Sequence, residues 1–144
     1  MFIVRATAVT DELMEAVTRL MPQLKLKYSL PTRGEMEALV GSKASILLIV
    51  RYPDENSPIV GMLTLLVYRV PSGVRAHVDD IVVDEDMRGQ GIGEALVRHA
   101  LNVAREAGAN GVALTTNPRR EAANRLYQRM GFNRWQTNVY FYEF

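Results

Sequence analysis

The spacing of hydrophobic and polar residues predicts strands and helices along the whole chain. Strands are expected over the ranges 2–6, 45–52, 59–68, 74–83 and 112–116. Four helices are expected: after Thr10, after Thr32, from Ile92 onward and around Tyr127. The aromatic-rich stretch 132–144 predicts one or two closing strands.

The connections between these elements indicate how the strands pair. Turn-forming residues join the three central strands over distances that suit antiparallel hairpins. A helix separates the strand at 74–83 from the strand at 112–116, so this pair is expected to be parallel. We therefore predict an α+β fold with a mixed sheet, in a single domain over residues 1–144.

Composition removes several functional classes. The 144 residues carry a net charge of +1, which gives no electrostatic case for binding nucleic acid or a membrane surface. The chain has no cysteine and only two histidines, so cysteine nucleophiles are excluded and no metal site is expected. No stretch has the length of a membrane span or the pattern of a signal peptide, and a cytoplasmic protein is expected.

The most informative stretch is Arg88-Gly89-Gln90-Gly91-Ile92-Gly93, which we call the glycine loop. A hydrophobic strand that carries Asp79 and Asp80 leads into it, and a predicted helix follows it. A glycine-rich turn in this setting points backbone N–H groups at one spot, where the helix dipole also favours negative charge. Arg88 adds a permanent cation. The glycine loop is therefore predicted to bind a phosphate or pyrophosphate group.

Two common phosphate-binding motifs do not fit the glycine loop. A P-loop ends in Gly-Lys-Ser/Thr, whereas Gly93 is followed by Glu94 and Ala95. A dinucleotide-binding loop follows the first strand and has an acidic residue about 20 residues downstream. Here the loop follows the fourth predicted strand, and the downstream stretch 111–114 is apolar.

Two signatures of the chain resemble those of the GNAT (Gcn5-related) N-acetyltransferases. The glycine loop matches the family motif Arg/Gln-x-x-Gly-x-Gly/Ala, and the stretch 126–132 matches Leu-Tyr-x-x-x-Gly-Phe. The residues Ile81-Val82-Val83-Asp84 stand where the family has a strand that ends in Val-x-Pro-like residues. The resemblance is strongest over 78–132 and implies the GNAT fold, a mixed six- to seven-stranded sheet flanked by about four helices.

The resemblance implies that acetyl-CoA is the co-substrate. Its pantetheine arm is expected to hydrogen-bond to the backbone of Ile81, Val82 and Val83, along a strand edge. Its pyrophosphate is expected on the N–H groups of the glycine loop, whose residues are Arg88, Gly89, Gln90, Gly91, Ile92 and Gly93. A purely structural strand-to-helix turn is the alternative interpretation of this loop.

Tyr127 resembles the family tyrosine that gives a proton to the departing coenzyme A thiolate. A phenol with a pKa of about 10 can serve as a general acid at neutral pH. Its helical spacing suits a core position equally well. Many family members have asparagine seven residues before this tyrosine, where this chain has Arg120. Whether Asn117, Asn124 or another group contacts the coenzyme amide therefore stays open.

Asp79 and Asp80 are candidates for binding the acceptor and for taking its proton. Small-amine members of the family, such as the glucosamine-phosphate acetyltransferases, often have an acidic pair at this place. Regular strand alternation would point only one of the two carboxylates into the cleft. His77 is a rival base, and an ion pair between an aspartate and Arg75 is the structural alternative.

The expected reaction is direct acetyl transfer from acetyl-CoA to a primary amine in a ternary complex, since the chain offers no covalent nucleophile motif. A backbone N–H near Val82 or Val83 is expected to polarise the thioester carbonyl. The identity of the acceptor stays open: it is either a small-molecule amine or a protein amino group. The alternative function is a noncatalytic acyl-CoA-binding sensor of the same fold. Family members often form homodimers, and the stretch 132–144 is a candidate interface.

Overall fold

The computed structural model describes residues 1–144. These residues divide into two compact units, Met1–Leu114 and Thr115–Phe144. The first unit contains one β-sheet and three α-helices, and the second unit contains one α-helix. None of the helices combines the length and the apolar character that a membrane crossing requires.

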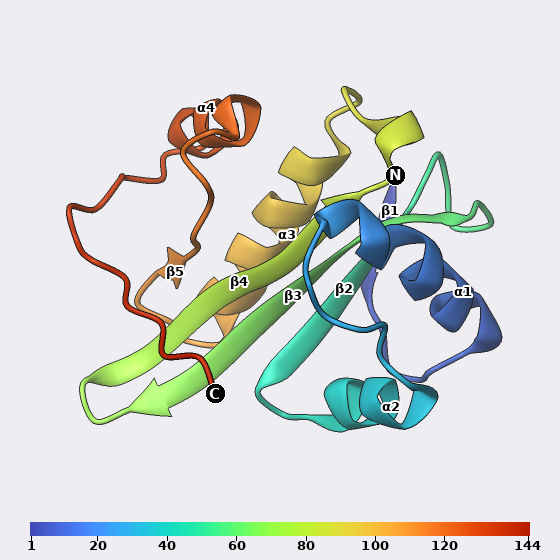
Figure 1. The fold of residues 1–144 in the computed structure, drawn as a ribbon, viewed down its shortest axis with the longest axis horizontal. Helices are drawn as coiled ribbons and strands as arrows, with labels where there is room; N and C mark the ends of the chain where they lie inside the picture. Colours follow the sequence, from blue (N-terminus) through green and yellow to red (C-terminus); the bar gives the residue numbers. More distant parts are fainter. The chain divides into compact units, whose positions relative to one another are not determined.

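Five strands form one mixed sheet in the first unit, in the order β1-β2-β3-β4-β5 (Figure 1). Their bounds are Phe2–Arg5 (β1), Ser45–Arg51 (β2), Ile59–Val70 (β3), Gly73–Val83 (β4) and Val112–Ala113 (β5). Neighbouring strands from β1 to β4 are antiparallel, whereas β4 and β5 are parallel. The predicted α+β class, the hairpins and the parallel crossover are thus confirmed.

Three α-helices belong to the same unit: α1 (Asp11–Leu20), α2 (Arg33–Gly41) and α3 (Ile92–Glu106). The short 3-10 helices η1 (Met21–Leu24) and η2 (Glu85–Met87) follow α1 and β4. Thr10 and Thr32 cap α1 and α2, because their hydroxyl oxygens accept hydrogen bonds from the backbone N–H groups of Leu13 (3.1 Å) and Glu35 (3.2 Å). These local signals were sufficient to predict where both helices begin.

The helices bury opposite faces of the sheet. On one face, α1 packs in a single hydrophobic cluster with five sheet residues: Leu47, Ile49, Ile59, Met62 and Val82. On the other face lies α3, where a Cβ placed on Gly61 would be 3.4 Å from Leu96 Cδ1. The central strands are therefore apolar on both sides, and Leu63 and Leu65 are fully buried.

The second unit contains α4 (Glu121–Arg129) and no strand. α4 ends in a Schellman motif, in which Gly131 has a left-handed backbone with φ +98°. The N–H of Gly131 donates to Gln128 O at 3.1 Å, and the N–H of Phe132 donates to Tyr127 O at 2.9 Å. Asn117 lies before the helix start, and its Oδ1 accepts a hydrogen bond from the N–H of Arg119 at 2.9 Å.

Two expectations about strands are wrong. The stretch 132–144 forms no strand, and β5 ends at Ala113 instead of at residue 116. The sheet consequently has five strands instead of six or seven. Aromatic composition gives a segment β-propensity, but a strand exists only where its backbone groups pair with a neighbouring strand. Neither 114–116 nor 132–144 has such a partner.

Candidate active site

A β-bulge interrupts β4 at Asp80 and Ile81. The pairing of β4 with β3 shifts by one residue at this point, so that both residues lie opposite the single residue Leu63. Asp80 has a left-handed backbone with φ +48°, which is uncommon for a residue other than glycine. A bulge bends its strand and increases the local twist, and it re-aims the neighbouring side chains.

The bulge changes which side chains of β4 share a face of the sheet. Paired residues of antiparallel strands lie on the same face, and Val82 pairs with Met62 of the α1 cluster. Thr64 follows Met62 by two positions on β3 and pairs with Asp79, so Asp79 also lies on the α1 face. His77 lies on this face by the same alternation. An uninterrupted strand would have placed Asp79 and Val82 on opposite faces.

The two carboxylates of β4 are exposed next to each other. Partial burial raises the pKa of Asp80 above its ordinary value of 3.8, and the negative charge of Asp79 raises it further. His77 Nε2 lies 3.8 Å from Asp79 Oδ2. Arg75 forms no ion pair with either aspartate and donates instead to Ser72 Oγ at 3.0 Å. A carboxylate with a raised pKa is the better proton acceptor.

One edge of β4 carries unpaired backbone groups. β5 pairs with β4 only at Ala76 and His77, so the parallel ladder ends before the bulge. Within the first unit the outer edge over 78–83, which includes Ile81, Val82 and Val83, has no strand partner. An extended ligand with amide groups can bind such an edge like an added strand.

The glycine loop continues from η2 into the first turn of α3. Gly89 and Gly91 have left-handed backbones with φ +79° and +77°, and Gly91 is the N-cap residue of α3. No side chain caps this helix, so its first N–H groups are open to an external acceptor. Any other L-residue at position 89 or 91 would be strained, although a Cβ would meet no atom within 4 Å.

The remaining loop residues offer different groups. Ile92 is 1% exposed and belongs to the core, so only its backbone is available, whereas Gln90 is exposed. A Cβ on Gly93 would lie 3.7 Å from Val83 Cγ2, which is ordinary contact. Arg88 forms no ion pair, and its Nε donates to Val83 O at 3.3 Å. Backbone donors, a helix N-terminus and a guanidinium group are thus available to an anion.

Tyr127 lies in the second unit, on α4, and only 9% of its surface is exposed. Its ring contacts Phe132 edge to face, with ring centroids 5.7 Å apart. This contact joins the two positions that the Schellman motif at Gly131 brings together. Burial raises the pKa of Tyr127 above its ordinary value of 10.0, and the nearby charge of Arg120 opposes the shift. The phenol therefore keeps its proton at neutral pH.

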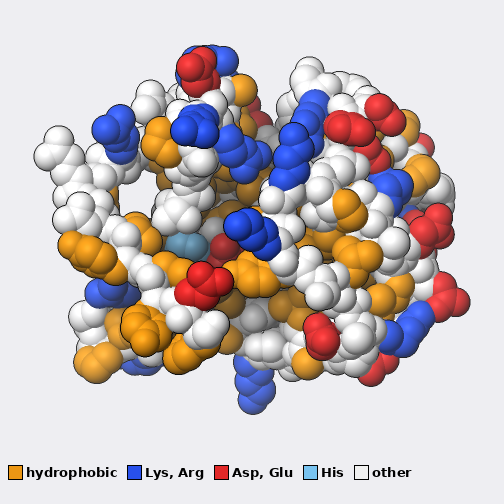
Figure 2. Space-filling view, in the orientation of Figure 1, with side chains coloured by type: hydrophobic (Ala, Val, Ile, Leu, Met, Phe, Trp, Pro, Cys, Tyr) orange, Lys and Arg blue, Asp and Glu red, His pale blue; other side chains and the backbone are white.

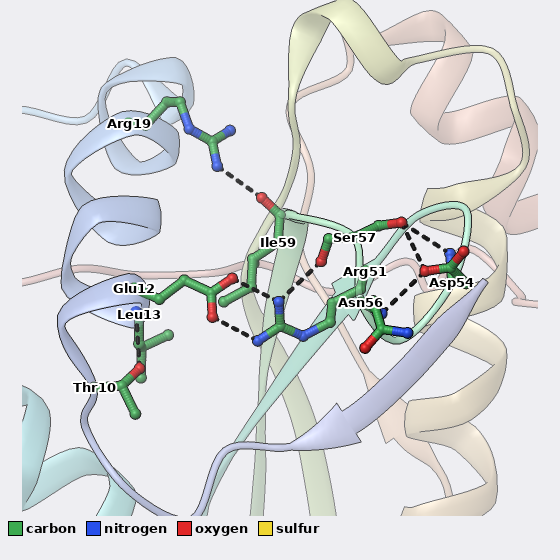
Figure 3. A network of polar contacts seen from close by, with 9 residues as sticks. All are labelled: Thr10, Glu12, Leu13, Arg19, Arg51, Asp54, Asn56, Ser57 and Ile59. Carbon is green, nitrogen blue, oxygen red and sulfur yellow. Dashed lines mark hydrogen bonds and ion pairs between the residues drawn. The ribbon is translucent and has the colours of Figure 1, made fainter.

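Two surface cavities, of about 250 Å³ and 180 Å³, are lined by residues outside the predicted site. The larger one borders a network of polar contacts between α1 and the stretch 51–59 (Figure 3). Over α1 and α2, acidic and basic side chains are interspersed without a large area of one sign (Figure 2). No three His, Cys, Asp or Glu side chains are grouped so that they could hold a metal ion.

Sequence reasoning missed two features of this site. One is the bulge, which depends on the register between β4 and β3. The other is an ion pair between Arg19 of α1 and Asp84, the residue that follows β4. The motif around Ile81–Asp84 drew attention to Asp84, but nothing in the sequence indicates a partner 65 residues away.

The chain belongs to the GNAT family, because the model of the acetyltransferase (GNAT) family matches residues 10–132. The matched stretch contains both signatures, the glycine loop and the stretch 126–132. The family resemblance inferred from these two motifs is thereby confirmed.

Two relatives show the range of proteins to which the chain is similar. The peptidyl-lysine N-acetyltransferase YjaB of Escherichia coli (strain K12) is 39% identical over 103 residues, 69% of this chain and 59% of that protein. The aminoalkylphosphonate N-acetyltransferase of Salmonella typhimurium (strain LT2) is 37% identical over 79 residues, 54% of this chain and 51% of that protein. The chain thus spans only part of the length of these relatives.

Solved structures share the fold over nearly the whole chain. An aminoglycoside acetyltransferase, meta-AAC0020, from an uncultured soil metagenomic sample superposes with a TM-score of 0.82 at 24% identity, covering 99% of this chain and 95% of that one. A transcriptional regulator from Bacillus halodurans C-125 superposes with a TM-score of 0.78 at 25% identity, covering 99% of this chain and 100% of that one. These similarities confirm the predicted fold class.

Proposed function

We propose that the protein is an N-acetyltransferase that transfers the acetyl group of acetyl-CoA directly to a primary amine. The observation that carries this proposal is the continuity of three features in the first unit: the bulge in β4, its unpaired outer edge and the glycine loop that follows. Family membership over residues 10–132, a stretch that includes parts of both units, supports a single catalytic domain over residues 1–144.

Acetyl-CoA is the proposed co-substrate, and two parts of the first unit bind it. The backbone groups of Ile81, Val82 and Val83 hydrogen-bond the pantetheine arm as an added strand. The N–H groups of the glycine loop bind the pyrophosphate, and the guanidinium of Arg88 adds a cation. The left-handed conformations of Gly89 and Gly91 support this role, since they leave space in front of the helix N-terminus.

The chemical step is an attack of the neutral amine nitrogen on the thioester carbonyl carbon. A backbone N–H near Val82 or Val83 stabilises the oxyanion that develops. Asp79 or Asp80, directly or through water, takes the proton that the amine loses, and the raised pKa of Asp80 favours it for this role. The carbon–sulfur bond then breaks, and the thiolate receives a proton from Tyr127, whose raised pKa keeps the phenol protonated.

The acceptor is a small-molecule amine or a protein amino group. Relatives include a peptidyl-lysine N-acetyltransferase and an aminoalkylphosphonate N-acetyltransferase, and both names describe a substrate that carries an amino group. The exposed carboxylates of Asp79 and Asp80 favour a cationic acceptor, because they attract the protonated amine before it is neutralised.

Calorimetric titration of the purified chain with acetyl-CoA, with ATP and NAD as controls, tests the coenzyme assignment. Binding of acetyl-CoA alone is the expected result, and absence of acetyl-CoA binding refutes the proposal. A thiol-release assay with a panel of small amines and lysine peptides then tests turnover. Binding without turnover on any amine would favour the noncatalytic acyl-CoA sensor instead.

A further inference from the structure

We propose that Arg19 of α1 is a positioning residue for the glycine loop, because its guanidinium holds and neutralises Asp84, which connects β4 to that loop. The inference rests on the proposed function, since it concerns how the coenzyme site is kept in place. The guanidinium of Arg19 donates to Asp84 and to Ile59 at the start of β3, so it acts on the glycine loop through Asp84 and the strand ends.

Asp84 lies between β4 and η2, the short 3-10 helix that precedes the glycine loop. Its N–H donates to Val60 O at 2.8 Å, which fixes it to β3 immediately after the last pair of the β3–β4 ladder. Its side chain is the N-cap of η2, and its backbone oxygen accepts a hydrogen bond from the N–H of Met87 at 2.8 Å. Only 15% of its side chain is exposed. A carboxylate this buried requires a partner.

Arg19 of α1 is that partner, and it contacts both Asp84 and the first residue of β3. Its Nη1 pairs with Asp84 Oδ2, and its Nη2 donates to Ile59 O, at the start of β3, at 2.7 Å (Figure 3 shows the second contact). One turn further on, Gln23 of η1 accepts a hydrogen bond from the N–H of Glu85 at 2.9 Å. The end of α1 and η1 therefore anchor the first two residues after β4.

The charge of Arg19 matters because of what precedes the glycine loop. Asp84, Glu85 and Asp86 are three consecutive acidic residues, and the glycine loop that begins two residues later is the proposed binding site of a pyrophosphate. Asp84 is the one of the three with an arginine partner in the structure. Without Arg19 its carboxylate would be an uncompensated negative charge, only four residues before Arg88, and it would repel the coenzyme.

The chain offers a matched control in Arg51. Like Arg19, Arg51 pairs with one carboxylate and donates to one backbone oxygen: its partners are Glu12 of α1, at 2.5 and 2.8 Å, and Ser57 O, at 2.9 Å (Figure 3). Both arginines thus connect α1 to the region where β3 begins: Arg51 donates to Ser57, just before β3, and Arg19 donates to Ile59, its first residue. Only Arg19 reaches the residue that leads into the glycine loop.

The test measures acetyl-CoA affinity by calorimetry and stability by thermal unfolding for Arg19→Met and Arg51→Met. We expect Arg19→Met to weaken acetyl-CoA binding about tenfold, the effect of roughly one uncompensated unit charge near the site. We expect Arg51→Met to change the affinity by less than about twofold, although it also removes an ion pair between an arginine and a carboxylate. If Arg19 has a purely structural role, Arg19→Met and Arg51→Met should both lower stability, and the two variants should bind acetyl-CoA with similar affinity.

The double variant Arg19→Met/Asp84→Asn distinguishes the effect of the Asp84 charge on acetyl-CoA affinity from the effect of losing the Arg19 contacts. Because asparagine carries no charge, we expect the double variant to bind acetyl-CoA more tightly than Arg19→Met alone. Equal affinity of the two variants would overturn the neutralising role of Arg19, and equal effects of Arg19→Met and Arg51→Met would overturn the inference as a whole. If the unmodified chain fails to bind acetyl-CoA, the proposed function itself is refuted.

Discussion

Substitution of Gly91 by glutamate tests the coenzyme assignment most directly. Gly91 is the N-cap residue of α3, with φ +77°, and a Cβ added to it would meet no atom within 4 Å. The substitution therefore creates no clash in the free protein. It places a side chain and a negative charge at the spot where the pyrophosphate is proposed to bind, and we expect acetyl-CoA binding to be lost or strongly weakened.

The expected magnitude follows from electrostatics. Two like unit charges about 4 Å apart repel by about 1 kcal/mol in water and by about 4 kcal/mol at the effective dielectric near a protein surface. Since about 1.4 kcal/mol corresponds to a factor of ten, the affinity should fall between about 5-fold and about 1000-fold. Stability should fall by roughly 1–2 kcal/mol, the cost of a left-handed L-residue, partly offset by the helix dipole.

Gly108→Glu is the matched control for backbone strain. Gly108 lies just beyond the C-terminus of the same helix, has φ +83° and also has open space around it. Gly108→Glu adds the same negative charge and places an L-residue in the same left-handed conformation. At this end of α3 the helix dipole disfavours the carboxylate. Gly108→Glu should therefore lose at least as much stability as Gly91→Glu and should still bind acetyl-CoA.

Calorimetric titration with acetyl-CoA and urea unfolding of the same preparations provide the two readouts. Loss of affinity in Gly91→Glu together with normal affinity in Gly108→Glu would support the loop assignment. Unchanged affinity in Gly91→Glu, or an equal loss in both variants, would refute the reasoning.

Three further substitutions test the roles of Tyr127, Asp80 and Gly131. Tyr127→Phe should leave acetyl-CoA affinity nearly intact and lower kcat by about 10²- to 10⁴-fold if the phenol is the general acid; an unaltered kcat would leave Tyr127 with a packing role. The folded-state pKa of Asp80 is raised, so its contribution to stability is present below about pH 3.8 and is lost as the pH rises through the folded-state pKa. Asp80→Asn should consequently raise the free energy of unfolding at pH 7 by more than at pH 3, and a difference independent of pH in urea unfolding would contradict this. Gly131→Ala should cost roughly 1–2 kcal/mol at the end of α4, visible as faster amide hydrogen exchange there, and unchanged exchange would argue against the Schellman motif.

The parts of the structure that depend on local signals could be predicted from the sequence. Thr10 and Thr32 begin helices because a hydroxyl group satisfies a backbone N–H three residues later. The position of the glycine loop, between a strand and a helix, followed from hydrophobic periodicity on both sides of it. Capping residues and hydrophobic periodicity were therefore sufficient to predict where most helices and strands begin, and to predict the fold class.

The parts that depend on pairing between distant segments could not be predicted. Alternation along β4 alone indicates that Asp79 and Val82 occupy opposite faces, and only the register with β3 reveals that they share one. The partner of Asp84 lies 65 residues away in α1. The aromatic stretch 132–144 has the composition of a strand but no ladder partner, which no local property of the sequence reports.

The bulge also makes β4 unusually tolerant of a change in chain length. Loss of one residue from a strand normally turns every side chain on one side of the deletion to the opposite face. Asp80 is the surplus residue of its ladder, so a chain without it would pair Ile81 alone with Leu63 and keep every other pair as it is. Such a shortened chain should fold with a straight β4. Evolution could thus add or remove the bend at this edge in one step, by a single-codon insertion or deletion, without rebuilding either hydrophobic face.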